Sequence, residues 1–338
     1  LWRPRRLTVA LPIICITLIA SVAVLRVGNW ERERALTNFK LVSDDLHHRI
    51  ETRLHEHLLV LQALRGVFVG SEDVTRREFR QVADPWLLRY PSIQAMGVYT
   101  LVEQADLAAF VAARRDEGLS DFEVFDRGEG GQRRPVRSAP RYEVLTYIEP
   151  LTRNRAAIGL SADSIDLVRR AIDRSALLDA PVVTRPFRLT QETGHQLGVV
   201  VYWRVSQRMG DPTAVHPQET HPASELNTVF VTMRLDDLLN NIVPTDAQAS
   251  VCLMSGSQGS LRQRYAGPAG CELANSGDET VDDRQFQFAD DIWTVRVTAS
   301  APLLASQGRW SAWFFAASGM LAVGLLCAFL LLVTGRTL

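Results

Sequence analysis

Two long apolar runs near the ends of the chain predict membrane-spanning helices. The first, at 8–25, reads TVALPIICITLIASVAVL, and the second, at 310–334, opens with Trp310 and Trp313. Neither run contains a charged residue, each has about the length that a bilayer core requires, and tryptophan is enriched at membrane interfaces. A cleavable signal peptide is the alternative for the first run, although no small-residue cleavage site is obvious.

The basic residues beside these runs predict the topology. Three arginines lie in the segment 1–7, and Arg336 lies in the segment 335–338. Because basic residues close to a span favour the cytoplasmic side, both ends are expected in the cytoplasm and the long middle region outside it. In a bacterial inner membrane that region is periplasmic. The chain begins without Met and stops just after Arg336, so we expect it to be part of a longer protein.

Apolar residues between 29 and 69 recur at an average spacing of about 3.6, which predicts one long helix. A helix of this length is not expected to cover its apolar stripe on one small domain at both ends, so its membrane-near half should pair with a second copy and form a homodimer. His48 and His55 lie two turns apart, but we expect them to face water and not to hold a metal. The stripe consists of Leu36, Phe39, Leu46, Ile50, Leu54, Leu58, Leu61, Leu64 and Phe68.

Strands and helices alternate from 70 to 222. Four stretches are apolar almost throughout and predict buried strands: IQAMGVYT, EVLTYIEPL, APVVTRPFRL and LGVVVYWRV. The segments QADLAAFVAARRDEG and SIDLVRRAIDRSALL have one apolar face and predict helices, the second capped by Ser164. A smaller lobe at 223–306, beginning with the strand NTVFVTMRL, follows. The fold class is therefore α+β, flanked by two transmembrane helices.

Composition and cysteines narrow the class of protein. A chain of 338 residues with 46% hydrophobic residues and a net charge of −1 is neither disordered nor a nucleic-acid binder. Cys15 and Cys327 lie in the apolar runs, whereas Cys252 and Cys271 lie in the exported region around a Gly- and Ser-rich loop. An oxidising compartment favours a disulfide between the second pair, with two unpaired buried thiols as the alternative. Metal binding through these two residues alone is not expected.

Several separated blocks resemble the CHASE sensory domains, which lie outside the membrane in plant cytokinin receptors and in many bacterial histidine kinases and cyclic-dinucleotide enzymes. These blocks, found in the family's order between 79 and 205, are RYPSIQAMGVY, YIEPLTRNRAAIGLSADSIDLVRRAIDRS, APVVTRPFRLTQ and LGVVVYWRV. The resemblance implies a long helix followed by two PAS-like lobes, with a small ligand in the membrane-distal lobe (70–222) and a membrane-proximal lobe at 223–306. It also implies a cytoplasmic output such as a histidine kinase or diguanylate cyclase.

The resemblance points to one ligand position, where this sequence departs from the family. In the cytokinin-binding members an aspartate follows the Gly-Leu of the strand and accepts hydrogen bonds from the adenine-type base, but this chain has Ser161. Losing a charge-assisted bond would cost such a base on the order of 1.5–3 kcal/mol, so we expect a small ligand recognised in another manner. Asp163 would share the face of Ser161 if the strand stayed extended. Alternatively, Asp163 and Ser164 start the next helix.

Four further residues complete the predicted ligand set. Tyr147 lies on the preceding strand, Thr184 and Arg188 lie in VVTRPFRL, and Thr193 lies in the loop TQETGHQLG, which resembles the family's loop beside its ligand. Each has a structural alternative; Arg188, for example, would fix the sheet by pairing with an acidic neighbour.

No catalytic constellation is found in the sequence. It contains no Gly-rich phosphate loop, no His-Glu-x-x-His and no serine nucleophile in a strained glycine context. We therefore expect neither an enzyme in these residues nor a cofactor or metal. Two functions remain: a sensor that binds a small molecule and signals across the membrane, or a dimerising interaction module for a periplasmic protein. An apolar pocket with inward polar groups would favour the first, and an exposed apolar patch the second.

Overall fold

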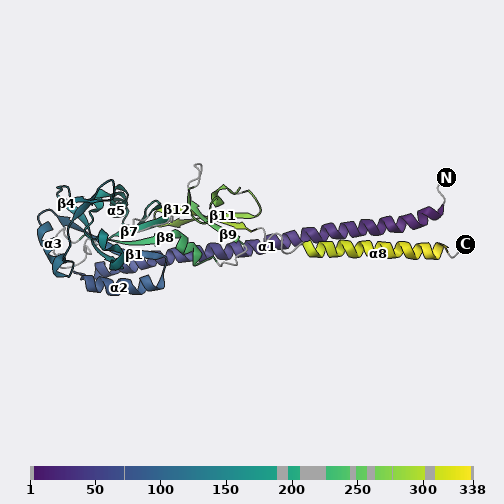
Figure 1. The fold of residues 1–338 in the computed structure, drawn as a ribbon, viewed down its shortest axis with the longest axis horizontal. Helices are drawn as coiled ribbons and strands as arrows, with labels where there is room; N and C mark the ends of the chain where they lie inside the picture. Colours follow the sequence, from purple (N-terminus) through teal and green to yellow (C-terminus); the bar gives the residue numbers. More distant parts are fainter. Residues whose placement is uncertain are drawn as a thin grey trace, which may run out of the picture.

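The computed structural model describes residues 4–71, 73–188, 197–205, 226–243, 249–256, 263–275, 277–300 and 309–335. The molecule is long and narrow, with both chain ends at the same tip (Figure 1). One helix, α1 (Pro4–Gly70), runs from that tip along two lobes, and the last helix, α8 (Arg309–Gly335), lies beside its first half. Mixed helices and sheets behind a long N-terminal helix agree with the predicted fold class.

The first helix is continuous where the apolar pattern predicted two helices, at 8–25 and 29–69. The junction contains one glycine, Gly28, and a lone glycine costs a helix only about 1 kcal/mol. Of the described residues, Ile14–Gly70 forms the one helix long and apolar enough to cross a membrane, and the apolar stretch within α8 is shorter, at Ala317–Phe329. The two helices approach closely at Gly319, where an added Cβ would lie 3.4 Å from the side chain of Ala20.

The larger lobe, at the end farthest from α8, is built on a six-stranded antiparallel sheet. The strand order is β4, β1, β8, β7, β5, and β6 also pairs with β7. The long central strands are apolar almost throughout because both faces of the sheet are covered. The strands are β1 (Ile93–Glu103), β4 (Arg141–Glu149), β5 (Val182–Val183), β6 (Phe187–Arg188), β7 (Leu197–Arg204) and β8 (Asn227–Arg234).

The predicted boundary between the lobes, at 222/223, is wrong. β8 was expected to open the smaller lobe, but it pairs with β1 on one side and β7 on the other, so the larger sheet ends only after Arg234. A strand buried on both faces has the same apolar pattern in either sheet, and the pattern does not reveal its partners. Helix α6 (Leu235–Asn240) then leads to the smaller lobe.

The smaller lobe is a four-stranded antiparallel sheet in the order β10, β9, β12, β11. Cys252 on β9 and Cys271 in the short helix η4 (Cys271–Leu273) form a disulfide. Buried Arg296 pairs with Asp283 and donates to the carbonyl oxygens of residues 271, 272 and 274, which fixes η4 to the sheet. The strands are β9 (Ala249–Ser255), β10 (Arg264–Ala266), β11 (Val281–Phe288) and β12 (Asp291–Ala299).

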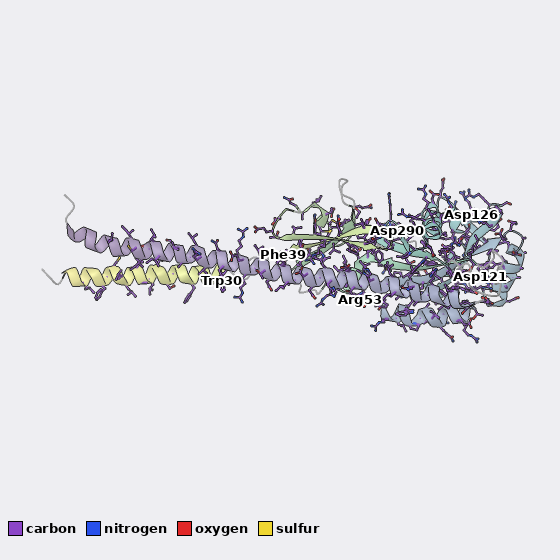
Figure 2. The ribbon with its side chains drawn as sticks, turned by 180° about the vertical axis from the view of Figure 1, so that it is seen from behind. Trp30, Phe39, Arg53, Asp121, Asp126 and Asp290 are labelled. Atoms are coloured by element: carbon purple, nitrogen blue, oxygen red, sulfur yellow. A yellow bond between two sulfur atoms is a disulfide. The ribbon has the colours of Figure 1, made fainter. Side chains whose placement is uncertain are left out.

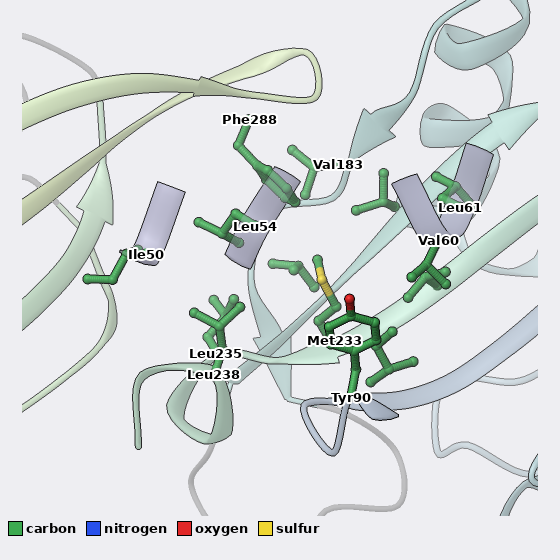
Figure 3. Close-up of a cluster of buried hydrophobic side chains, with 14 of the residues drawn as sticks. Ile50, Leu54, Val60, Leu61, Tyr90, Val183, Met233, Leu235, Leu238 and Phe288 are labelled. Atoms are coloured by element: carbon green, nitrogen blue, oxygen red, sulfur yellow. The ribbon is translucent and has the colours of Figure 1, made fainter. Parts of the chain in front are cut away.

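The apolar stripe of α1 is buried against the chain's own lobes. Figure 3 shows Ile50 and Leu54 in one cluster with Leu235 and Leu238, which come from α6, and with Phe288 of the smaller lobe. Six stripe residues are nearly inaccessible: Phe39, Leu46, Ile50, Leu54, Leu61 and Leu64. This stripe therefore does not join two copies as predicted, because the smaller lobe covers the half that was expected to remain open.

The two faces of the larger sheet have different coverings. On one face, α1 and α2 (Arg76–Arg89) pack, and α2 begins with a capping box in which Thr75 and Glu78 exchange hydrogen bonds. The opposite face, here called the α5 face, is covered by α5 (Asp166–Leu178), α3 (Leu107–Asp116) and the segment 119–125. The remaining elements are β2 (Phe125–Arg127), β3 (Arg133–Pro135), α4 (Leu151–Asn154), η1 (Arg155–Ala157) and η2 (Ala162–Ser164).

Candidate functional site

The α5 face of the larger sheet has an aromatic floor. The rings of Tyr99, Tyr202 and Phe230, on three neighbouring strands, lie with centroids 5.6–6.2 Å apart. Gly97 makes room for this packing, since an added Cβ would lie 2.3 Å from the Phe230 ring. Both tyrosines are buried, and neither hydroxyl makes a hydrogen bond with another described residue. Burial raises the pKa of both phenols, and for Tyr99 the charge of Glu143 adds to this effect.

A buried ion pair crosses the same face of the sheet. Glu143 of β4 accepts hydrogen bonds from Thr228 Oγ1 of β8 and from Arg204 Nη2 of β7, each at 3.0 Å. The side chains of Glu143 and Arg204 are only 8% and 12% exposed. Burial raises the pKa of Glu143, while Arg204 and the two hydrogen bonds oppose that rise. The pair is thus placed where an unmatched charge is costly.

The hydrogen bonding of this pair is incomplete. Arg204 Nε and Nη1 are buried and have no partner among the described residues. The main chain around Arg204 is fixed, because its N–H donates to Ser175 Oγ of α5 at 2.9 Å. Buried polar groups in proteins are nearly always paired, so unpaired donors mark a place where a water, ion or ligand is expected.

Ser161 lies at the edge of this face, on the extended stretch that ends in η2. Its N–H donates to the carbonyl of Phe125 at 2.9 Å, and Ser161 bridges to Val144 of β4. Gly159 allows the close approach, because it has φ +85° and an added Cβ would lie 2.0 Å from the Glu123 carbonyl oxygen. Ser161 is 1% exposed, and its Oγ has no partner among the described residues.

Of the two alternatives for Asp163, the extended strand that would place it beside Ser161 is not formed. The chain leaves the extended conformation directly after Ser161 and forms the 3-10 helix η2, so Asp163 does not share the face of Ser161 and is exposed. Partial burial still raises the pKa of its carboxyl. Ser164 does not cap α5; its hydroxyl donates to the Ser161 carbonyl, and the helix begins at Asp166 after Ile165.

Tyr147 lies on the opposite face of the sheet from the aromatic floor. Its ring packs against Phe79 in the core shared with α1 and α2, and its hydroxyl donates to Glu117 Oε2 at 2.8 Å and accepts from Arg114. Burial raises the pKa of this phenol. Tyr147 and Ser161 therefore do not line one site as predicted.

The remaining predicted residues do not converge on Ser161 either. Thr184 is buried and exchanges hydrogen bonds with the main chain of Val200, which holds β5 to β7. Arg188 is exposed on β6. Thr193 lies outside the described residues. Glu143 and Arg204 were missed, although a charged residue inside an apolar strand is a usable signal because such residues are seldom buried without a partner.

An open groove of about 390 Å³ lies away from this face. Its lining is mostly polar and comes from the outer side of α1 and the end of α6: His48, Arg49, Thr52, Arg53, Glu56, Asn241 and Ile242. A site for a small organic ligand usually combines enclosure with apolar walls, which this open and mostly polar groove lacks.

Comparisons with known proteins concern both sequence and fold. The family model described as CHASE domain matches residues 72–263, more than half of the chain. The periplasmic sensory domain of the Campylobacter jejuni chemoreceptor Tlp1 is similar at 11% identity and TM-score 0.45, covering 82% of this chain and 98% of that one. The ligand-binding domain of the Pseudomonas aeruginosa PAO1 amino acid chemoreceptor PctC, in complex with GABA, is similar at 13% identity and TM-score 0.38, covering 85% and 100%. No curated protein matches the chain.

Proposed function

This chain belongs to the CHASE domain family of extracytoplasmic sensory domains, and we propose that it binds a small-molecule signal on the α5 face of its larger lobe. The signal then passes across a bacterial inner membrane to a cytoplasmic output, such as a histidine kinase or a diguanylate cyclase. The first part of α1 and α8 cross the membrane, and the two PAS-like lobes lie in the periplasm. The residues of this chain act by binding and not by catalysis.

The observation that carries the proposal is the set of unpaired polar atoms in an otherwise apolar place. Arg204 Nε, Arg204 Nη1 and Ser161 Oγ are buried on or beside the α5 face without a described partner. Leaving a buried polar group unpaired costs about 1–3 kcal/mol, more for a charged group. A ligand that supplies the missing partners recovers this free energy, which is a physical basis for selective binding.

The α5 face is mechanically connected to the smaller lobe. Asp290, in the turn between β11 and β12, accepts a hydrogen bond from Val183 N–H of β5 at 2.8 Å and pairs with Arg174 Nε of α5 at 2.8 Å. Figure 2 shows Asp290 on the side of the smaller lobe that faces the larger one. A ligand that shifts α5 would therefore move this turn as well.

The smaller lobe in turn contacts the membrane-near part of α1. Asp282 of β11 accepts a hydrogen bond from Ser43 Oγ at 2.6 Å and lies 3.5 Å from His47 Nε2, and Arg284 pairs with Asp44. These contacts connect α5, the turn at Asp290, β11 and α1 in series. A ligand changes the output only if it binds one arrangement of this series more tightly than the other.

The test is thermal unfolding of the full chain in lipid nanodiscs, followed by tryptophan fluorescence. Adenine-type purines, amino acids and small carboxylic acids are added singly to the wild type and to Ser161→Asp. We expect at least one compound to raise the Tm of the wild type, since a ligand at 100 times its Kd stabilises by about 2.7 kcal/mol. Adenine-type compounds should stabilise Ser161→Asp more than the wild type.

Two results would count against the proposal. If no compound raises the Tm of either protein, the alternative of a dimerising interaction module for a periplasmic partner is favoured. If adenine-type compounds stabilise the wild type as strongly as Ser161→Asp, Ser161 does not exclude recognition in the cytokinin manner.

A further inference from the structure

We propose that the ligand of the α5 face is a zwitterion of the amino acid class, whose carboxylate binds Arg204 and whose ammonium group binds Glu143. This inference rests on the proposed function and specifies the ligand for the same site. It follows from how the ion pair is placed and from which of its hydrogen-bonding positions are occupied.

The pair has spare capacity on both of its members. Glu143 Oε1 accepts from Thr228, and Glu143 Oε2 accepts from Arg204, so each oxygen has one lone pair left for a further donor. Arg204 retains buried N–H donors at Nε and Nη1. The site therefore offers an acceptor and a donor side by side, and its ligand must present a donor and an acceptor in the same arrangement.

The charges decide between classes of ligand. A simple carboxylate would satisfy Arg204 but would also lie beside the carboxylate of Glu143, which is 8% exposed. A simple amine would satisfy Glu143 but would lie beside the guanidinium of Arg204. Like charges repel strongly where water is excluded. For either ligand, the repulsion at one residue of the pair therefore offsets the binding free energy gained at the other. A zwitterion places each charge next to its opposite and adds no net charge to a buried site.

The surroundings suit the remainder of such a molecule. The aromatic floor formed by Tyr99, Tyr202 and Phe230 lies on the same face as Arg204 and Glu143 and makes their environment apolar. The hydroxyl of Ser161 adds a neutral donor and acceptor without a described partner. An apolar or neutral polar side chain is thus favoured over a charged one.

The experiment measures binding to the full chain in nanodiscs by isothermal titration and by the shift in Tm. The common L-amino acids are tested first, and each hit is compared with two analogues, its des-amino carboxylic acid and its α-amide. For L-leucine these are 4-methylpentanoate and L-leucinamide. We expect at least one amino acid to bind, and both analogues to bind at least tenfold more weakly, because each lacks one of the two charges.

Variants connect that selectivity to the two residues. Glu143→Gln, which is isosteric, should weaken binding of the amino acid at least tenfold, and Arg204→Gln should do the same. The matched controls are Asp121→Asn and Arg155→Gln, which make the same changes at the exposed ion pair of the same lobe, whose Nη2–Oδ1 distance is 2.5 Å. Both controls should bind as the wild type does. Cooperative melting of each ligand-free variant shows that it is folded.

The possible failures are distinguishable. If purines or simple acids stabilise the wild type but no amino acid does, the sensor proposal stands and this inference is overturned. It is also overturned if the des-amino or amide analogue binds as tightly as the amino acid, a comparison that needs only the wild type. Unchanged binding in folded Glu143→Gln and Arg204→Gln would show that the ion pair only fixes the sheet.

Discussion

Buried histidines connect α1 to the structures packed on it. His57 Nδ1–H donates to the carbonyl of Arg53 at 2.6 Å, which leaves Nε2 to accept from Ser92 Oγ at 2.8 Å. This arrangement needs the neutral ring. Burial lowers the pKa of His57 below its usual 6.5, with Arg53 acting in the same direction, while the Arg53 carbonyl and Glu56 oppose the shift. His47 has a lowered pKa for the same leading reason.

The pH dependence of stability follows from the direction of these shifts. Below pH 6.5 the unfolded chain takes up a proton more readily than the folded one, so the stabilisation present above that pH is lost as the pH falls. We expect Tm to decrease between pH 7.5 and 5.5, and His57→Gln to reduce the slope. His55→Gln, at an exposed position on the same helix, is the control and should leave the slope unchanged. Equal slopes in wild type and His57→Gln would contradict this account.

Among the site residues, the sequence located Ser161 correctly but not the orientation of Tyr147. Ser161 was located from the Gly-Leu motif, and it is buried at the predicted strand end. Tyr147 was predicted beside the ligand from its place on the preceding strand, but the register of that strand shifts, because Val98 pairs with Tyr147 and Tyr99 with Leu145. A bulge of this kind turns the following side chain to the other face of the sheet, and the local sequence contains no signal that predicts the bulge.

At the level of elements, the turn at Asp290 provides polar contacts between the lobes. Asp290 Oδ1 satisfies the N–H of Val183, and its Oδ2 pairs with Arg174, which is largely exposed. Replacing Asp290 by alanine leaves a partly buried N–H without its partner, and losing such a hydrogen bond costs about 1–3 kcal/mol.

We therefore expect Asp290→Ala to lower Tm and to accelerate hydrogen exchange at Val183 N–H. The neighbouring Asp291→Ala, at an exposed position, provides the control with little expected effect. Once a stabilising compound is known, its effect on hydrogen exchange in β11 should be smaller in Asp290→Ala than in the wild type. Unchanged exchange at Val183 would show that the turn does not hold the lobes together.

Strong periodicity predicted most of the helices and strands, and weaker signals did not. The helix α2 has a mixed polar surface and was not recognised, although the Thr75-x-x-Glu78 pattern before it is a capping box. The strand β8 was recognised but assigned to the wrong sheet, because pairing with β1 and β7 is a long-range contact. Apolar pattern predicts that a strand is buried and leaves open which strands lie beside it.

On the scale of the whole molecule, the outward side of α1 remains available to a second copy. Leu41 and Leu59 are 63% and 61% exposed, whereas Leu46 is 3% exposed. We propose that two chains anchored in one membrane associate in parallel through this outward side. The natural cysteines give little background, since Cys252 and Cys271 form a disulfide and the other two lie in the predicted spans.

One labelling experiment tests both the dimer and the topology. In spheroplasts, Leu41→Cys should react with a membrane-impermeant maleimide and crosslink to a second chain with a bis-maleimide. Leu46→Cys, about 140° around the helix axis from Leu41 and buried, is the matched control and should do neither. Labelling of Leu41→Cys only after lysis would overturn the topology, and labelling without crosslinking would argue against the dimer.

The uninterrupted hydrogen bonding of α1 limits the kinds of signal that can reach the cytoplasm. At about 1.5 Å per residue, 67 helical residues form a rod about 100 Å long. Such a rod bends only gently unless a breaker interrupts it, so sliding along its axis or turning about it are the displacements that arrive undiminished at Pro4. The contacts of His57 and Asp44 are then places where the lobes can displace α1. The signal is a change in the axial position or the rotation of this helix. Inserting residues into α1 near Gly28 would therefore change the rotation of the membrane-spanning part relative to the lobes, at about 100° per residue. It would not change what the lobes bind.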